Sequence, residues 1–104
     1  MNDAKTRILF VTPKGDSKRL KFKECDNEIL NVTVDVHGMK CWEARRFLNN
    51  ILNIAKSRIE ISVIHGYNHG TDIKDMINCN FSNPHVQKIY SDNYNMGITH
   101  ILAA

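Results

Sequence analysis

Two runs of β-branched residues, each ending at a His-Gly pair, most strongly constrain the fold of this 104-residue chain. The first run reads Val34-Asp35-Val36-His37-Gly38, and the second reads Ile64-His65-Gly66-Tyr67-Asn68-His69-Gly70-Thr71. A helical pattern follows each of them. Because strand-helix-strand units place parallel strands beside each other, we expect both His-Gly turns at one edge of a single sheet.

The spacing of apolar residues predicts the elements around the first turn. Residues 32–37 alternate with a period of two, as a half-buried strand does. From about Met39 to Lys56 the apolar residues recur at intervals of three and four, which predicts an amphipathic helix. Its buried stripe is expected to comprise Ala44, Phe47, Leu48, Ile51, Leu52 and Ala55.

The second half of the chain repeats this order and then adds two strands. Residues 59–64 predict a strand, and a second helix begins near Thr71 with Asp72 in its first turn, where the helix dipole favours an acid. Residues 86–90 and 97–102 predict the last two strands. The order β-α-β-α-β-β predicts an α/β fold, a two-layer sandwich with a mixed four-stranded sheet and both helices on one face.

Residues 1–30 form an extension that precedes this 31–104 domain. Residues 8–12 and 20–23 have strand-like patterns, and residues 13–17 have turn chemistry, so an N-terminal β-hairpin is expected. The extension also carries a cluster of basic residues, namely Lys14, Lys18, Arg19, Lys21 and Lys23. This cluster is compatible with a solvated surface or with a basic arm that touches phosphates.

Composition narrows the cellular setting of the protein. The net charge of +3 and the sequence pI near 8.8 are compatible with a polyanionic partner but do not require one. Cys25, Cys41 and Cys79 are odd in number and widely spaced, which favours a reducing compartment over a disulfide framework or a zinc site. With no apolar leader and no run of about 18 apolar residues, we expect a cytoplasmic protein without a membrane span.

Asp35 and His37 are the first candidates for catalysis. They are two residues apart on the predicted strand, so both side chains are expected on one face. A carboxylate beside an imidazole can orient the ring and stabilise its protonated form, which makes His37 a usable acid or base. Functional groups of α/β folds gather at the carboxyl ends of strands, although an isolated Asp-x-His pair is also common as a structural feature.

The loop after the second strand is the stronger candidate for ligand binding. Gly66 and Gly70 allow the backbone to approach a ligand closely, and Asn68 tolerates a left-handed conformation. Free amides at the start of the following helix favour a phosphate. The loop has neither the Gly-Lys-Ser/Thr of a P-loop nor the glycine spacing of a dinucleotide-binding loop, and a tight turn without a ligand is the alternative.

Several neighbouring residues allow more than one interpretation. His65 and His69 could bind a metal ion together with His37 or Asp35, although their spacing falls in a loop rather than a helix. Lys74 could hold a flanking phosphate, as could Arg45 or Arg46, or all three could be ordinary surface charges. Tyr67 could stack on a base or pack within the loop, and Trp42 is expected to pack at the core or its rim.

Taken together, these motifs resemble the small MutS-related (Smr) domain, here as a stand-alone protein. The family begins with a strand ending in Leu-Asp-Leu-His-Gly or a near variant, which residues 34–38 match. Its helix contains a Glu-Ala pair, like Glu43-Ala44, and its second signature is His-Gly-x-Gly-x-Gly, like residues 65–70. Its closing Gly-x-Thr strand is similar to residues 97–101. The resemblance covers roughly residues 31–102, and Asn68 replaces the middle glycine of the loop.

The resemblance implies a fold similar to the C-terminal domain of bacterial translation initiation factor three. It also implies a nucleic-acid partner, DNA or RNA, because several family members are nucleases, some of them acting on messenger RNA at the ribosome. Asp35 and His37 would be the catalytic pair. His65, Gly66 and Gly70 would form the loop that contacts the substrate backbone. Together with these three, the residues that we expect to bind the substrate are Gly38, Tyr67, Asn68, His69, Thr71 and Lys74.

We therefore expect an endonuclease that nicks DNA or cleaves RNA. With RNA, the 2′-hydroxyl can attack and no metal is required, whereas with DNA water must attack and Mg²⁺ or Mn²⁺ is expected to assist. The alternative from another class is a non-catalytic module that binds nucleic acid or the ribosome. A metal-dependent hydrolase of a small phosphorylated substrate is the third possibility.

Overall fold

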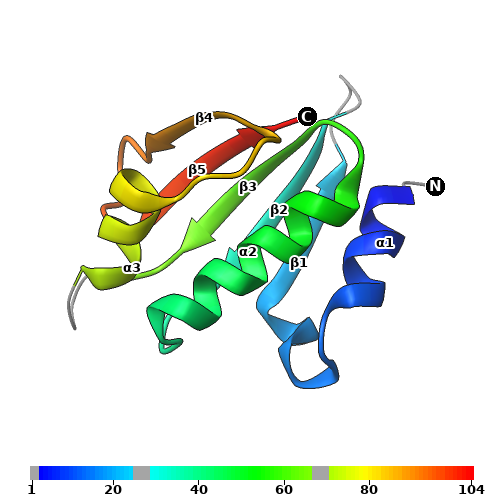
Figure 1. Ribbon diagram of the computed structural model, residues 1–104, viewed down its shortest axis with the longest axis horizontal. Helices are drawn as coiled ribbons and strands as arrows, with labels where there is room; N and C mark the ends of the chain where they lie inside the picture. Colours follow the sequence, from blue (N-terminus) through cyan, green and yellow to red (C-terminus); the bar gives the residue numbers. More distant parts are fainter. Residues whose placement is uncertain (1–2, 25–28, 67–70) are drawn as a thin grey trace.

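The computed structural model describes residues 3–24, 29–66 and 71–104. Helices cover one face of a five-stranded mixed sheet whose strand order is β1-β2-β3-β5-β4 (Figure 1). The strands are β1 (Leu20–Glu24), β2 (Leu30–Asp35), β3 (Ile59–Ile64), β4 (Val86–Ser91) and β5 (Ile98–Ala103). The helices are α1 (Asp3–Val11), α2 (Cys41–Ala55) and α3 (Asp72–Asp75), with a 3₁₀ segment, η1 (Lys14–Arg19), and a π-helical segment, η2 (Met76–Asn80).

Strand pairing follows the predicted strand-helix-strand order. β2 and β3 are parallel and are connected through α2, whereas β1 with β2, β3 with β5, and β5 with β4 are antiparallel. This confirms the α/β class and the β-α-β-α-β-β order from residue 30 onward. The sheet has five strands instead of four because β1 pairs along the free side of β2.

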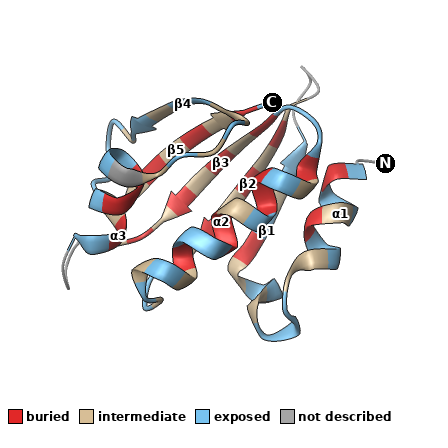
Figure 2. Cartoon of the chain, in the orientation of Figure 1, coloured by how far each residue is buried: buried red, intermediate tan, exposed pale blue. Residues whose placement is uncertain are grey.

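The period-two alternation of the central strands separates the two faces of the sheet. Val32 and Val34 of β2 and Ile61 and Val63 of β3 are fully buried beneath the helices (Figure 2). The intervening residues are half-buried and lie on the opposite face. All three helices contribute to one core with the inner face of the sheet.

The long helix α2 carries the apolar stripe that its sequence predicts. Every member of that stripe, from Ala44 to Ala55, is buried. At its beginning, the Glu43 carboxylate accepts the main-chain N–H of Lys40 at 3.0 Å, which satisfies a donor that lacks a helical partner. At its end, Lys56 adopts a left-handed conformation with φ of 53°. No helix of the described part of the chain is long and apolar enough to cross a membrane.

The N-terminal segment differs from the prediction. Residues 8–12, which we expected to form the first strand of a hairpin, belong largely to helix α1. The helix is favoured because Ala4 and Ile8, one turn apart, are both buried in the common core. In addition, the Arg7 guanidinium donates to the carbonyls of Ile54 (2.9 Å) and Ala55, which end α2 without helical partners. Residues 20–23 do form a strand, but it pairs with β2.

Candidate functional site

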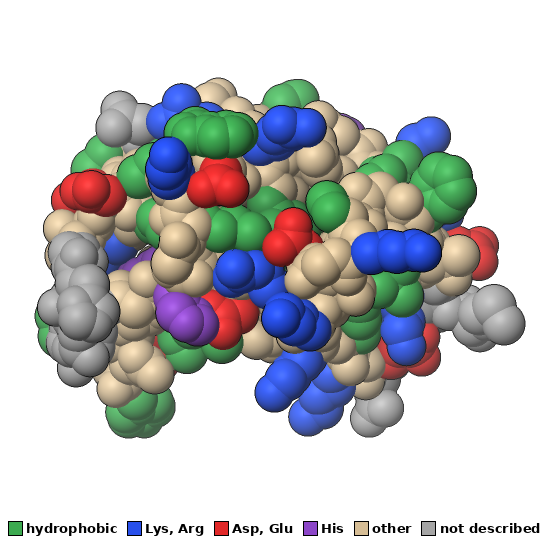
Figure 3. Space-filling view, turned by 90° about the horizontal axis from the view of Figure 1, so that it is seen from below, with side chains coloured by type: hydrophobic (Ala, Val, Ile, Leu, Met, Phe, Trp, Pro, Cys, Tyr) green, Lys and Arg blue, Asp and Glu red, His purple; other side chains and the backbone are tan. Residues whose placement is uncertain are grey.

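The two His-Gly turns lie next to each other at one edge of the sheet. Asp35 and Ile64, the last residues of β2 and β3, are register partners in the parallel ladder. Just beyond them, the main-chain N–H of Val36 donates to the carbonyl of Ile64 at 2.9 Å. This confirms the predicted juxtaposition. Figure 3 views this end of the molecule and shows a histidine beside an acidic side chain, with several Lys and Arg side chains nearby.

Asp35 and His37 contact each other, but His37 lies beyond the end of β2 in a turn rather than on the strand. The Asp35 Oδ1 atom is hydrogen-bonded to His37 Nδ1 and also accepts the main-chain N–H of His37 at 3.1 Å. Gly38 follows with φ of +82°, a conformation that favours glycine. The turn is completed by a hydrogen bond in which the main-chain N–H of Met39 donates to the carbonyl of Val36 at 3.0 Å.

This geometry fixes the tautomer of His37 and exposes its other nitrogen. An ionised carboxylate can only accept hydrogen bonds, so the ring nitrogen that faces Asp35 carries a proton. The other nitrogen, Nε2, has no hydrogen-bond partner among the described residues, and the His37 side chain is 67% exposed. The ring is therefore oriented at one nitrogen and accessible at the other, as a group that exchanges protons with a ligand must be.

Arg19 supports this turn from the N-terminal segment. Its Nη1 donates to the carbonyls of Asp35 (3.1 Å) and His37 (3.2 Å), and its Nε donates to the Asp16 carboxylate (3.2 Å). The sequence placed Arg19 only within a basic cluster, and nothing in the sequence distinguished it from its neighbours. It reaches the turn because β1, which begins at the next residue, pairs with β2.

His65 is buried and uses both ring nitrogens within the protein. Its Nδ1 donates to the Gly66 carbonyl at 2.7 Å, and its Nε2 accepts the Thr99 hydroxyl at 2.8 Å. Burial lowers the pKa of His65 below its ordinary value of 6.5, the bond to Gly66 opposes this, and the positive charge of Lys74 lowers it further. His65 therefore favours the neutral form and stabilises the beginning of the loop.

Gly97, which the resemblance placed only in the closing Gly-x-Thr strand, contacts the beginning of the second loop. Its carbonyl accepts the N–H groups of His65 (2.9 Å) and Gly66 (3.1 Å), and Gly66 has φ of +73°. A Cβ atom on Gly97 would lie 3.2 Å from the Gly66 Cα. The amide of Gly66 is thus already engaged, and any loop amide that contacts a phosphate would come from a later residue.

Part of the predicted loop lies outside the described residues, namely Tyr67, Asn68, His69 and Gly70. At the far side of this segment, Thr71 is exposed at the N-cap position of α3, and its hydroxyl donates to the Asp75 carboxylate at 2.9 Å. Lys74 is half-buried on α3 and lies close enough to His65 to affect its pKa.

The described residues form no metal-binding cluster, and the chain matches no known family or structure. Within residues 3–24, 29–66 and 71–104, no group of three or more His, Cys, Asp or Glu side chains could hold a metal ion. No protein-family model matches the chain, and neither a curated protein nor a solved structure matches it.

Proposed function

We propose that the protein is a small endonuclease, similar to Smr-type nucleases, in which Asp35 and His37 act on the nucleic-acid backbone. The observation that carries this proposal is the orientation of the His37 ring. Nδ1 is held by the Asp35 carboxylate, Nε2 has no hydrogen-bond partner among the described residues, and the side chain is exposed at the edge of the sheet. Such an arrangement supplies an acid or base together with the group that orients it.

On RNA the chemistry requires only groups that this chain supplies and solvent. Nε2 of His37 takes the proton of a 2′-hydroxyl, the 2′-oxygen bonds to phosphorus, and the bond from phosphorus to the 5′-oxygen breaks. The 5′-oxygen gains a proton from solvent, leaving a 2′,3′-cyclic phosphate and a 5′-hydroxyl. Asp35 stabilises the imidazolium that forms and prevents rotation of the ring.

Cationic groups at the same edge support a phosphate-bearing ligand. Lys74 lies on the β3 side of the edge, Arg19 lies on the β2 side, and Lys40 is exposed just after the His37 turn. Gly38 and Gly66 lie in the turns that follow β2 and β3, Thr71 lies at the N-cap of α3, and His65 is bonded to Gly66 and Thr99. The predicted contacts of residues 67–70 with the substrate stay predictions, as does the cytoplasmic location.

A divalent ion would supply charge neutralisation and an activated water if the substrate is DNA. The described residues do not fit a resident ion, because the Asp35 Oδ1 atom is engaged with His37 and no second carboxylate joins it in a metal-binding group. We therefore derive no step through Mg²⁺ or Mn²⁺ from these residues.

A non-catalytic module that binds nucleic acid or the ribosome is the second candidate. It is favoured by the bond from the His37 main-chain N–H to Asp35 Oδ1, since a purely structural turn uses the same contact. In that case Asp35 and Arg19 would shape the turn, and the basic edge would bind phosphates without cleaving them.

Cleavage assays with matched histidine variants test the proposal. Labelled single-stranded RNA, duplex DNA and branched DNA are incubated with Mg²⁺, Mn²⁺ or EDTA. We expect His37→Ala to reduce cleavage by roughly 10²- to 10⁴-fold, and Asp35→Ala to reduce it as well. His85→Ala is the control, because His85 precedes β4 at the opposite end of the sheet. Equal binding by all variants without cleavage would support the non-catalytic module.

A further inference from the structure

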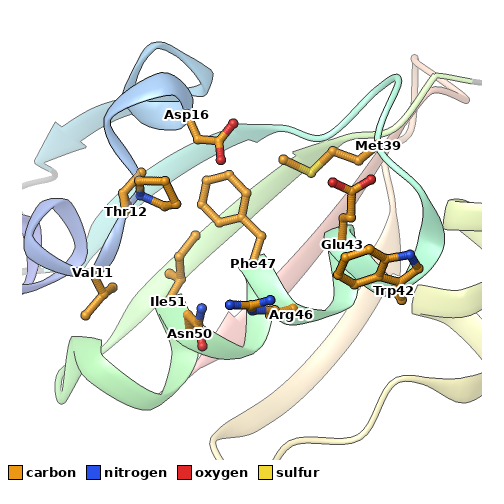
Figure 4. A pocket seen from close by; sticks show the side chains of 11 residues that line it. Val11, Thr12, Asp16, Met39, Trp42, Glu43, Arg46, Phe47, Asn50 and Ile51 are labelled. Atoms are coloured by element: carbon orange, nitrogen blue, oxygen red, sulfur yellow. The ribbon is translucent and has the colours of Figure 1, made fainter.

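A pocket lies beside the His37 turn, between α2 and the segment that runs from the end of α1 into η1 (Figure 4). Its volume is about 270 Å³. Trp42, Arg46 and Asn50 line it from α2, and because they are spaced by four residues they lie along one ridge of the helix. Phe47 is buried within it, whereas Trp42 is 60% exposed. The pocket thus combines a buried aromatic ring with an accessible one.

From this chemistry we propose that the pocket binds one unpaired nucleobase of a single-stranded nucleic acid. A base can stack on the exposed indole of Trp42, and the Arg46 guanidinium can stack on the base or pair with its oxygen atoms. The volume lies just below the range of roughly 300–1,000 Å³ that is typical of pockets for drug-sized ligands, so it suits a single planar ring system.

The polar groups of the pocket also suit a nucleobase. Asn50 offers an amide donor and an acceptor, and the carboxylates of Asp16 and Glu43 can accept the amino groups of bases. Each carboxylate already has a partner: Asp16 accepts from Arg19 at 3.2 Å, and Glu43 accepts the N–H of Lys40 at 3.0 Å. The Arg19 guanidinium therefore partly compensates the charge of Asp16 before a strand binds.

Because the pocket adjoins the His37 turn, its occupant is expected to belong to the nucleic-acid strand that contacts His37. Asp16 lines the pocket and is bonded to Arg19, which donates to the carbonyls of Asp35 and His37. Met39, two residues after His37, lines the pocket as well. A strand with one phosphate at His37 would place a neighbouring base in the pocket. This inference rests on the proposed function, and it adds that the substrate is single-stranded near the reacting phosphate.

The fluorescence of Trp42 tests the proposal directly, because Trp42 is the single tryptophan of the chain. The probes are short polyadenylate and polyuridylate strands and an abasic strand of the same length, which has the sugar-phosphate backbone without bases. We expect the two base-containing strands to quench the fluorescence at concentrations where the abasic strand has no effect. Equal quenching by the abasic strand, or no quenching by any of the strands, would overturn the proposal.

Substitution of the indole provides a second measurement, by fluorescence anisotropy of labelled polyuridylate. We expect Trp42→Ala to weaken binding by about 5- to 150-fold, as the loss of one stacked base does, and Trp42→Phe to retain most of the affinity. Tyr94→Ala is the control, because Tyr94 is 98% exposed and lies between β4 and β5. Unchanged affinity in the Trp42→Ala variant would contradict the base pocket.

Two sets of results distinguish the base pocket from the proposed nuclease activity. Cleavage that depends on His37 but is identical in Trp42→Ala and native protein would overturn the base pocket and leave the nuclease standing. Base-dependent quenching that is equal in His37→Ala and native protein, without cleavage by either, would support the pocket and contradict the nuclease. Far-ultraviolet circular dichroism of each variant verifies that it is folded.

Discussion

The buried His65 imidazole accepts a hydrogen bond from the Thr99 hydroxyl at 2.8 Å, and this bond joins β5 to the loop that follows β3. Both residues are buried, with Thr99 fully inaccessible. We predict that Thr99→Val, which keeps the shape but removes the donor, lowers the free energy of unfolding by ~1–3 kcal/mol. Urea denaturation measures the effect. Thr33→Val, on the open face of β2, is the matched control, and an equal loss in both variants would contradict the prediction.

The lowered pKa of His65 predicts that stability depends on pH in a defined window. The unfolded chain binds a proton at this histidine near pH 6.5, whereas the folded protein binds it at a lower pH. The stabilisation is therefore present above pH 6.5 and is lost as the pH falls through the folded pKa. Urea denaturation at pH 7.5, 6 and 5 should show decreasing stability, and His65→Gln should flatten this dependence.

Asp92 affects stability in a lower pH range than His65, so it does not contribute to the change between pH 7.5 and 5. The ring N–H of His100 and the main-chain N–H of Tyr94 hold the pKa of Asp92 below its ordinary value of 3.8. Its stabilising effect is present above that value and is lost only at lower pH. A loss of stability between pH 7.5 and 5 that persists unchanged in the His65→Gln variant would argue against the assignment to His65.

The close approach of Gly97 to Gly66 predicts that a methyl group at position 97 is destabilising. A Cβ atom on Gly97 would lie 3.2 Å from the Gly66 Cα and equally close to Asn95 Oδ1. We expect Gly97→Ala to lower stability by ~1–3 kcal/mol, as overpacking does, and to displace the loop after β3. Gly15→Ala is the control, because nothing lies within 4 Å of its added Cβ. Thermal unfolding and amide spectra compare the two variants.

Arg19 should affect cleavage through the position of His37. Loss of its bonds to the two carbonyls of the turn allows the ring to move, and we expect Arg19→Ala to reduce cleavage by roughly ten- to a hundredfold. Arg19→Lys keeps the charge without the planar fork, so it should resemble Arg19→Ala if geometry is what matters. Lys21→Ala controls for lost charge. Faster amide exchange at Met39 would accompany the effect, and native exchange would contradict it.

The central strands and α2 could be predicted because local pattern and tertiary burial agree there. Residues 59–64 alternate in sequence and alternate in burial, and the stripe of α2 is buried as expected. The prediction of a strand over residues 8–12 was wrong, because a run of β-branched and apolar residues favours a strand locally. The helix forms there because of contacts with α2, namely the burial of Ile8 and the bonds of Arg7, which involve residues far away in the sequence.

The site was predictable only where its residues are close together in the chain. Asp35 and His37 are two residues apart, and the adjacency of their turn to Gly66 follows from the parallel pairing of β2 and β3. Arg19, the last residue of η1, is brought to the site by the pairing of β1 with β2, and Gly97, just before β5, and Thr99, near its beginning, are brought there by the pairing of β5 with β3. The register of these pairs could not be predicted from local sequence patterns. For the same reason, the sequence alone could not show whether the His65 side chain is buried or exposed.

The position of β1 has a consequence for the boundaries of a minimal protein. Ile8 and Leu20 are buried in the common core, and β1 satisfies the outer backbone groups of β2 from Leu30 to Val34. A chain shortened to residues 31–104 would leave β2 as an open edge strand, with unpaired amides and carbonyls beside newly exposed apolar surface. Such edges recruit other strands, so the shortened chain would be prone to self-association and aggregation.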